Sequence, residues 1–358
     1  MCTADARPFP QLGNRETSLL QSSLDSFWLA VSTDILTIRH DLTDRLPLKL
    51  GVATLRLRMQ QVTVRVPAST SNLGPGFDCL GVALRIYNSI TVTGGRLPER
   101  PHPQIVLQAA GRFFKQARRR AFPFSFSIVE KIPRSRGLGS SATIRLGILY
   151  ALNQLSGDPL DRLTIFQLCA DLEGHPDNAA PASFGGFTVV TSGATAPVAR
   201  RKPDTGPTFQ RFEVSPRLYF VLLVPDLKIR TSMARKVLPS KISRAAAVEN
   251  CANACTITAA FASKDYDNLR GAFADHLHQP FREKLISSLR QVIAGAEKAG
   301  ALGAFLSGSG STICGITLRH PDRVAAAMKR AAQSSLSRTI VTRADSEGAQ
   351  ILNLKSEI

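Results

Sequence analysis

A regular alternation of apolar and polar residues begins at Val62. Val62, Val64 and Val66 are separated by polar residues, a pattern that predicts a half-buried strand ending at Pro67. The same alternation predicts a strand over residues 124–128, and further strands are predicted over residues 85–93, 218–224 and 338–344. Residues 68–78, between the first two strands, are rich in turn-forming residues and predict a loop.

Apolar residues spaced by three and four positions predict the helices. The clearest case places Ile144, Ile148, Ala151, Leu152 and Leu155 on one helical face. Helices are also predicted over residues 105–120, 245–261, 281–298 and 322–334, and a hairpin over residues 304–317. This mixed order of strands and helices, without an internal repeat, indicates an α+β protein.

The first 58 residues differ from the rest of the chain. Their periodicity is patchy, they carry no chemical motif, and their acidic residues do not suit a transit peptide. Met59 precedes the first clear strand, so we expect either that Met59 is the native start or that residues 1–58 are a dispensable extension. The segment 193–216 is rich in glycine, proline, threonine and arginine, and predicts a boundary between two domains, 59–210 and 211–358.

The composition permits a folded protein with buried cores. Of the 358 residues, 44% are hydrophobic and 20% are charged. Apolar runs such as residues 218–225 are far shorter than a bilayer requires, so we expect no membrane partner. Six cysteines are scattered along the chain, which favours a reduced, cytoplasmic protein. We interpret Cys251 and Cys255 as small core residues rather than as a metal-binding pair.

The chain is strongly basic, with 45 lysines and arginines against 27 acidic residues and a formal net charge of +18. Such a balance suits nucleic acid, an anionic surface or an anionic small substrate. Aromatic residues are 6% of the chain and do not interleave with the basic ones, so bases would find no stacking platform. We therefore expect no nucleic-acid partner and interpret most of the excess as solvated surface charge.

The strongest local motif is Gly137-Leu-Gly-Ser-Ser-Ala142, between a predicted strand and a predicted helix. Glycines let the backbone approach an anion, and the first N–H groups of a helix point at it. The hydroxyls of Ser140 and Ser141 can donate to phosphate or bind magnesium. The motif is neither a Walker A loop nor a dinucleotide fingerprint. The alternative is that this segment only caps the helix.

A second polar group is Glu173-Gly-His-Pro-Asp-Asn178, at the end of a helical pattern. Mg²⁺ prefers hard oxygen ligands and takes one or two carboxylates beside substrate phosphates, a role that suits Glu173. The alternative is a polar turn, because Gly174 and Pro176 both stop helices. By itself, His175 is interpreted as structural.

Three further segments contain candidate binding residues. Residues 231–235 and 275–282 each end in an arginine, which can clamp a carboxylate through two charge-assisted bonds or simply lie at the surface. Residues 306–312 form a glycine-rich turn between apolar strands. Taken alone, that turn could belong to any tight hairpin.

Together these motifs resemble the homoserine kinases, a family of the GHMP small-molecule kinase superfamily. The segments that carry the resemblance are, in order, Pro67-Ala-Ser-Thr-Ser-Asn-Leu-Gly-Pro-Gly-Phe-Asp78, Ile132-Pro-Arg-Ser-Arg-Gly-Leu-Gly-Ser-Ser-Ala142, Glu173-Gly-His-Pro-Asp-Asn178 with Phe187, Thr231 with Arg235, His278-Gln279-Pro280, and Ser307-Gly-Ser-Gly310. The resemblance covers about residues 59–352. It implies a GHMP kinase fold, with an N-terminal domain like ribosomal protein S5 domain 2 and a ferredoxin-like C-terminal domain.

The resemblance also implies ATP and Mg²⁺ as cofactors, with ATP bound by the N-terminal domain. The implied nucleotide contacts are Pro133, Arg134, Ser135, Arg136, Gly137, Leu138, Gly139, Ser140, Ser141, Ala142 and Thr143. Magnesium would be held by Ser141, or by Ser140, together with Glu173. Arg134 and Arg136 depart from the small residues common in the family, and either reach phosphate or only narrow the loop.

The implied substrate is L-homoserine, phosphorylated to O-phospho-L-homoserine for threonine biosynthesis. Its implied contacts are Asn72, Asp78, His175, Asp177, Thr231, Arg235 and Arg282. Asp78 suits the ammonium group, and the two arginines suit the carboxylate. Asn72, or the catalytic pair Asp177 and Asn178, would aim the hydroxyl at the γ-phosphorus, and a general-base role for Asp177 stays open.

The sequence leaves two other functions and one state of assembly open. The chain could phosphorylate another alcohol, such as mevalonate, within the same superfamily. It could also be a relative that has lost catalysis and binds a ligand or nucleic acid as a regulator, although intact loop serines and Glu173 argue against this. A homodimer is an open possibility.

Overall fold

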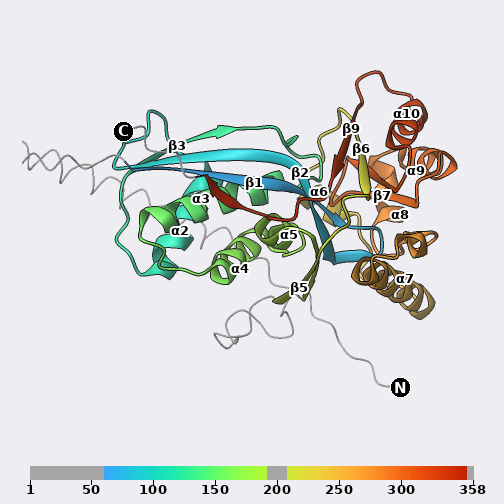
Figure 1. The fold of residues 1–358 in the computed structure, drawn as a ribbon, viewed down its shortest axis with the longest axis horizontal. Helices are drawn as coiled ribbons and strands as arrows, with labels where there is room; N and C mark the ends of the chain where they lie inside the picture. Colours follow the sequence, from blue (N-terminus) through green and yellow to red (C-terminus); the bar gives the residue numbers. More distant parts are fainter. Residues whose placement is uncertain (1–59, 192–207, 353–358) are drawn as a thin grey trace, which may run out of the picture. The chain divides into compact units, whose positions relative to one another are not determined.

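Two β-sheets organise the residues that the computed structural model describes, 60–191 and 208–352 (Figure 1). The elements in chain order are β1 (Gln61–Asn72), β2 (Gly76–Gly94), α2 (Gln104–Ala117), β3 (Phe124–Val129), α3 (Ser140–Leu155), α4 (Arg162–Glu173), α5 (Ala179–Phe184), β4 (Phe187–Thr191), β5 (Thr208–Phe212), β6 (Tyr219–Val224), α6 (Thr231–Lys236), α7 (Arg244–Ser263), η2 (Tyr266–Leu269), α8 (Gln279–Arg282), η3 (Glu283–Leu285), α9 (Leu289–Lys298), β7 (Gly303–Leu306), β8 (Ile313–Thr317), α10 (Pro321–Ala331), β9 (Arg338–Arg343) and β10 (Gln350–Leu352). The expected α+β class is confirmed by this mixture. Residues 1–58 and most of the segment 193–216 lie outside the described ranges.

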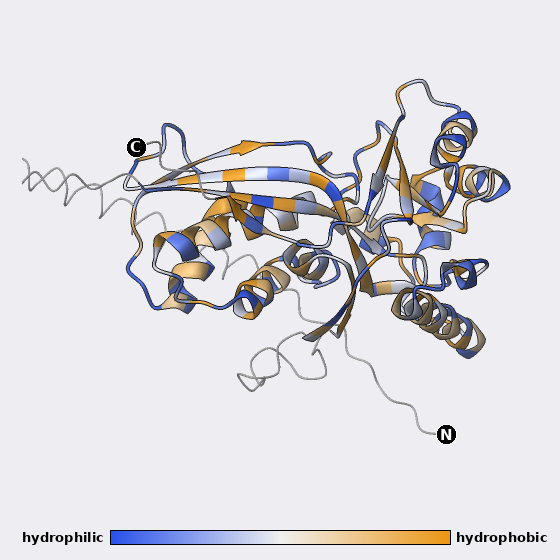
Figure 2. Cartoon of the chain, viewed as in Figure 1, coloured by the Kyte–Doolittle hydropathy of each residue, from blue (hydrophilic) through white to orange (hydrophobic). Residues whose placement is uncertain are grey.

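The first sheet has the strand order β10-β1-β2-β4-β5, with β3 paired to β2. Helices α2 to α5 cover one of its faces (Figure 1). Val62, Val64 and Val66 of β1 share a buried core with helix residues such as Phe113 and Leu149. The alternation that predicted this strand is visible as changing hydropathy along β1 and β2 (Figure 2). It arises because successive side chains of a strand point to opposite faces.

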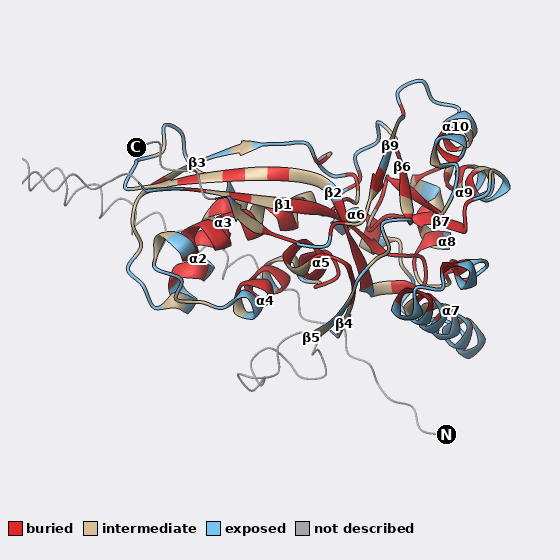
Figure 3. Cartoon of the chain, in the orientation of Figure 1, coloured by how far each residue is buried: buried red, intermediate tan, exposed pale blue. Residues whose placement is uncertain are grey.

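The second sheet has the strand order β7-β8-β6-β9. With two of its helices it follows the chain order β6-α9-β7-β8-α10-β9, which is the ferredoxin-like order expected for the C-terminal half. Phe220 and Leu222 of β6 lie in one core with Leu80 of β2, whereas Val221 and Leu223 pack in another core with residues of α9 and α10. The first of these cores joins the two sheets, and buried residues are dense where their strands meet (Figure 3).

The segment 68–78 is not the loop that its turn-forming residues predicted. β1 continues to Asn72 and β2 begins at Gly76, so only a short turn remains between them. Residues 68–71 pair with residues 81–84 of β2, and every residue from Val66 to Asn72 is buried. Pairing and burial outweigh the local preference of serine and threonine for turns.

The helix predicted over residues 281–298 is interrupted. α8 ends at Arg282, and α9 does not start until Leu289. Between them Ile286 has φ −139° and ψ 82°, and its side chain is buried in the core beneath α9. The helix breaks because this conformation lets Ile286 reach the core.

Helix α7 corrects our interpretation of two cysteines. Cys251 and Cys255 are exposed, whereas the helix packs through residues such as Asn250, Ile257 and Phe261. The prediction was wrong because alanines occur on every side of this helix, so the sequence does not show which face is buried. At 20 residues, α7 is the longest helix in the described ranges. Neither it nor any other described helix combines the length and the apolar character needed to cross a membrane.

Candidate active site

One cavity of about 280 Å³ brings most of the predicted site residues together. Its volume is close to the lower end of ordinary ligand pockets, about 300–1,000 Å³. The predicted residues that line it are Asn72, Asp78, Ser135, Gly137, Leu138, Gly139, Ser140, Ser141, Glu173, His175, Asp177, Asn178, Thr231, Arg235 and Arg282. The predicted residues that do not line it are Pro133, Arg134, Arg136, Ala142 and Thr143.

The segment before α3 has the geometry of an anion-binding helix entrance. α3 starts after Gly139, which has a φ of 68°, and no described side chain caps its first turn. The N–H groups of that turn are therefore available to a ligand, which disfavours the alternative of a simple cap. A Cβ on Gly139 would lie 2.2 Å from Oγ of Ser69, and one on Gly137 would lie 2.1 Å from the carbonyl oxygen of Ser307. Close packing therefore requires both glycines.

A buried asparagine that we did not predict holds both ends of this loop. Asn88 is 1% exposed, and its Oδ1 accepts the N–H groups of Lys131 at 3.0 Å and Ile132 at 3.1 Å. Its Nδ2 donates to Oγ1 of Thr143 at 3.0 Å. Thr143 and Ala142 are thus buried supports of the loop and do not face the cavity. Nothing local in the sequence marks Asn88, because its partners lie more than 40 positions away.

The two arginines of the loop turn to protein partners. Arg136 is buried, and its guanidinium donates to the carbonyl oxygen of Pro225 at 2.9 Å and to Asp226 at 2.7 Å. Arg134 is exposed and forms an ion pair with Glu130. These contacts favour the alternative in which the arginines shape the loop without reaching phosphate.

The turn between β7 and β8 contacts the loop before α3, although we did not predict this turn as part of the site. Ser307 Oγ donates to the carbonyl oxygen of Gly137 at 2.6 Å, and the N–H of Gly308 donates to the carbonyl oxygen of Ser71 at 3.1 Å. Gly308 lines the cavity together with Ser71 and Phe77, which sequence reasoning also missed. A signal existed, since all of them lie inside motifs that carry the family resemblance. The sequence does not show, however, that the first motif (67–78) and the last motif (307–310) are in contact.

Glu173 stands at the last turn of α4, directly opposite the start of α3. Ser141 Oγ donates to Oε2 of Glu173 at 2.7 Å, and Arg145 forms an ion pair with the other carboxylate oxygen. The side chain of Glu173 is 6% exposed. One hydroxyl and one carboxylate beside an anion-binding loop are hard oxygen donors of the kind that Mg²⁺ prefers, so the donor set fits this ion. Arg145 orients the carboxylate and leaves Oε2 directed at Ser141.

Asp78 and Arg235 form a bidentate ion pair in the same cavity. The guanidinium donates to the two carboxylate oxygens at 3.0 and 2.7 Å. The two side chains are 31% and 38% exposed, so a ligand in the cavity can reach them. Asp78 is held in place by its own N–H, which donates to Oδ1 of Asn72 at 3.1 Å.

A second guanidinium, that of Arg282, is almost completely buried beside this pair. It donates to the carbonyl oxygens of Ala234 at 3.1 Å and Gly308 at 2.9 Å. Burial, together with the charge of Arg235, lowers its pKa to about 10, so it is still a cation at neutral pH. His278 Nδ1 accepts a further bond from Arg282 at 3.2 Å, while Nε2 donates to the carbonyl oxygen of a glycine. Burial lowers the pKa of His278 to about 4, so this imidazole is neutral and orients Arg282.

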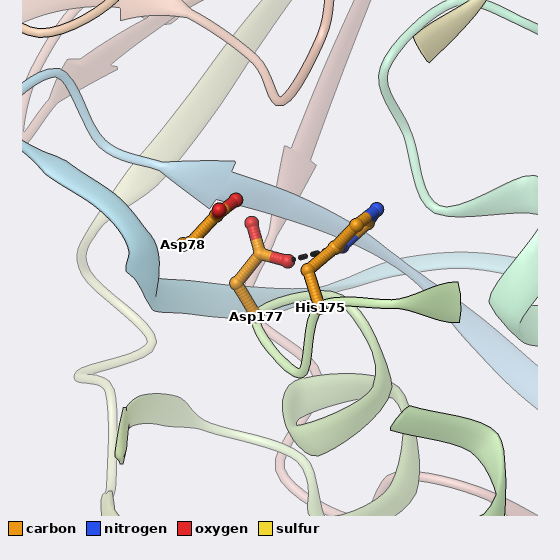
Figure 4. Close-up of side chains that lie close together, drawn as sticks. All are labelled: Asp78, His175 and Asp177. Atoms are coloured by element: carbon orange, nitrogen blue, oxygen red, sulfur yellow. Dashed lines mark hydrogen bonds and ion pairs between the residues drawn. The ribbon is translucent and has the colours of Figure 1, made fainter. Parts of the chain in front are cut away.

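Three acidic and imidazole side chains gather in the cavity (Figure 4). Polar atoms of Asp78, His175 and Asp177 all lie within 4.8 Å of one another. His175 Nδ1 donates to Oδ1 of Asp177 at 2.8 Å. A metal ion at this place would have to displace Arg235, which occupies both oxygens of Asp78. A ligand with both charges could instead exchange with the ion pair, giving a cation to Asp78 and an anion to Arg235.

Comparison with known proteins identifies the family. Residues 104–186 match the GHMP kinases N terminal domain, and residues 257–334 match the GHMP kinases C terminal domain. The homoserine kinase of Moorella thermoacetica is 36% identical over 280 residues, which cover 75% of this chain and 91% of that protein. The homoserine kinase of Carboxydothermus hydrogenoformans is 34% identical over 322 residues, covering 83% of this chain and 99% of that protein. The chain belongs to the homoserine kinase family.

The fold comparison agrees with membership of the homoserine kinase family. The crystal structure of homoserine kinase from Cytophaga hutchinsonii superposes with a TM-score of 0.71 at 24% identity, covering 86% of this chain and 100% of that chain. At this identity the likeness shows the fold alone. The resemblance stated from the sequence motifs, the GHMP kinase fold and the kinase class are thereby confirmed.

The His175–Asp177 pair in this homoserine kinase family member predicts a measurable titration. Burial by itself lowers the pKa of His175, but the hydrogen bond and charge of Asp177 outweigh it and hold the pKa above its ordinary value. In Asp177→Asn the charge is gone and burial remains, so we expect the pKa of His175 to fall below its ordinary value. NMR titration of the imidazole ring nitrogens measures this directly. A pKa that stays raised in the variant would contradict the pairing.

The same pair predicts the pH dependence of stability. Burial opposes ionisation of Asp177, but its bonds to His175 outweigh burial and hold its pKa below the ordinary value. The ion pair therefore stabilises the folded chain between about pH 4 and 6.5, and its contribution is lost as the pH rises through the raised pKa of His175. The difference in unfolding free energy between wild type and Asp177→Asn should be largest in that window. Urea unfolding at several pH values tests this.

Proposed function

We propose that this chain transfers the γ-phosphoryl group of ATP to the side-chain hydroxyl of L-homoserine, giving ADP and O-phospho-L-homoserine for threonine biosynthesis. The observation that carries the proposal is that a single cavity of about 280 Å³ contains both an anion-binding helix entrance and a bidentate acid–arginine pair. The first suits the phosphates of a nucleotide, and the second suits both charged ends of an amino acid.

ATP would be bound by the backbone of the loop 135–141. The free N–H groups at the start of α3 would donate hydrogen bonds to the β- and γ-phosphates, where the helix supplies partial positive charge. Ser141 and Glu173 would hold Mg²⁺, and we favour Ser141 over Ser140 because only its hydroxyl bonds to Glu173 in the described structure. When bound, the ion would neutralise charge on the phosphates.

The amino acid would take the place of the contact between Asp78 and Arg235. Its ammonium group would face Asp78, and its carboxylate would face Arg235, with Arg282 as the second cation. Thr231 lines the same part of the cavity at the start of α6. The substrate carboxylate would then gain the two Arg235 donors that now bond to Asp78, and the substrate ammonium group would replace Arg235 as the cation beside Asp78. The exchange of partners is therefore electrically balanced.

The hydroxyl of the substrate would be aimed by the loop after α4. Both polar atoms of the Asn72 side chain are already engaged with backbone groups, which favours the Asp177–Asn178 pair for this task. Asn178 is fixed by Ser69 and Ser71 at 2.8 and 3.0 Å. Because the pKa of Asp177 is lowered, its carboxylate is a weak base at neutral pH, and we assign it positioning of the hydroxyl. Catalysis would then rest on alignment and charge neutralisation.

A substrate panel tests the proposed reaction. Purified full-length chain with Mg²⁺ and ATP is assayed by coupled ADP release with L-homoserine, D-homoserine, L-serine and mevalonate. We expect kcat/KM for L-homoserine to exceed that for each other alcohol by at least about 100-fold, because one added or missing contact is worth about 1–3 kcal/mol and several differ here. Turnover of mevalonate without turnover of L-homoserine would overturn the substrate and leave the kinase family intact.

The cellular setting is part of the same proposal. We assign the chain to the cytoplasm, where thiols stay reduced, since the cysteines in the described ranges are all free. We also propose a homodimer as its assembly. Sedimentation of the full chain, with a mass of 38.7 kDa per subunit, distinguishes a dimer from a monomer.

A further inference from the structure

A second and larger hollow lies at the other end of the β7–β8 hairpin. The closed end of this hairpin, residues 307–312, contacts the loop before α3. Its open end, where the chain enters β7 and leaves β8, borders a cavity of about 580 Å³. The end of α9, the start of α10 and η2 complete the walls. None of its lining residues belongs to the catalytic cavity.

The walls of this cavity are strongly cationic. The charged residues among its described lining are Arg217, Arg270, Lys298, Arg319, Arg323 and a single acid, Asp267. His320 adds a titratable ring. Within the described ranges, none of the five cations has an acidic partner within salt-bridge distance. Five cations therefore share one hollow with one carboxylate.

Some exposed arginines pair with an acid, as Arg112 does with Asp171 at 3.1 Å, whereas others in the described ranges, such as Arg118 and Arg119, have no acidic partner. This cavity differs because five such cations line one hollow. Like charges that converge on a concave surface repel one another, and the field that they share attracts anions from solution. An anion bound between them relieves that repulsion, and a multiply charged anion relieves more of it.

Two further features narrow the ligand. The start of α10, an 11-residue helix, borders the cavity through His320 and Arg323 and adds partial positive charge. The lining contains no phenylalanine, tyrosine or tryptophan, so a nucleobase would find no ring on which to stack. Leu302 and Leu318 supply only a small apolar part.

We propose that this cavity is a second ligand site, which binds a small anion with at least two negative charges and no aromatic ring, such as a diphosphate or a phosphate ester. The ligand is distinct from the substrates of the catalytic cavity, and the inference does not depend on the proposed reaction. A longer polyanion such as nucleic acid is the competing ligand. It is disfavoured by the absence of a stacking surface in the lining.

Isothermal titration with inorganic pyrophosphate tests the site. Full-length wild type is titrated in buffer with EDTA, so that no magnesium pyrophosphate forms, and is compared with the double variant Arg319→Glu/Arg323→Glu. The matched control is Arg118→Glu/Arg119→Glu, which makes the same change of charge at the exposed end of α2. Circular dichroism verifies that each variant is folded. Any binding to the loop before α3 appears equally in all three proteins.

We expect wild type and control to share a saturable event that is at least about tenfold weaker or absent in Arg319→Glu/Arg323→Glu. Raising NaCl from 50 to 200 mM should weaken it, because exposed charges are screened. Equal loss in the control would show a general charge effect and overturn the site, as would the absence of saturable binding in wild type. Tighter binding of a 12-nucleotide single strand than of pyrophosphate, abolished by the cavity variant alone, would assign the cavity to nucleic acid instead.

Discussion

Replacing Glu173 by glutamine is expected to lower kcat about 100- to 1,000-fold while KM for L-homoserine changes by less than about threefold. The carboxylate faces Ser141 at 2.7 Å beside the anion-binding entrance, and within the described residues it forms no hydrogen bond or ion pair with Asp78 or Arg235. Losing one charged group that acts on the transferring phosphoryl costs about 3–4 kcal/mol in the transition state. Initial rates at varied Mg²⁺ and L-homoserine concentrations separate the two constants.

The control for this experiment lies on the same helix. Asp171→Asn makes the same chemical change two positions earlier, where the carboxylate is 44% exposed and pairs with Arg112. We expect its kcat to stay within about twofold of wild type, because exposed ion pairs contribute little. Glu173→Gln also leaves Arg145 without a charged partner, so thermal unfolding must show that the variant is folded at the assay temperature. A folded Glu173→Gln enzyme with wild-type kcat would remove Glu173 from the magnesium site.

Replacing Arg235 by alanine is expected to raise KM for L-homoserine about 10- to 150-fold and to change KM for ATP by less than about threefold. The guanidinium makes two bonds to Asp78 and would transfer them to the substrate carboxylate. A charge-assisted contact of this kind is worth about 1.5–3 kcal/mol. Steady-state kinetics with each substrate varied in turn measure both constants.

The neighbouring Lys236→Ala is the matched control on α6. Its side chain is exposed and does not line the cavity, so its removal should leave KM for L-homoserine within about twofold. If Arg235→Ala and Lys236→Ala had the same modest effect, the carboxylate would bind elsewhere. A loss confined to the ATP constant would place Arg235 on the nucleotide side of the cavity.

The parts of the site that the sequence predicts best are those made by short, local chemistry. Gly137, Gly139 and the serines that follow them predict an anion-binding helix entrance, because close approach of the backbone and free N–H groups need those residue types at that spacing. Glu173 followed by Gly174 predicts the end of a helix that presents a carboxylate, and Gly174 does end α4 with a φ of 78°. For the same reason the alternating strands could be anticipated, since side-chain period follows backbone geometry. The ferredoxin-like order, in contrast, was implied by the family resemblance.

Contacts between distant segments could not be predicted in this way. Asn88 holds the loop before α3 through partners more than 40 positions away, and Ser307 reaches Gly137 across 170 positions. Residues 68–71 read as turn formers, yet pairing with residues 81–84 of β2 makes them part of a buried strand. Local preference is weak compared with burial and strand pairing, so the long-range partner decides.

The amino-acid order alone was enough to recognise the family and the kind of fold, and to predict residue types suited to phosphate and an amino acid. Only the folded chain decided which charges face the cavity. Arg136 belongs to the segment before α3 in sequence but is neutralised by Asp226, whereas Asp78 and Arg235, 157 positions apart, meet in the cavity. The physical reason is that a charge acts over a few ångströms, and tertiary structure alone determines which opposite charge lies within that distance.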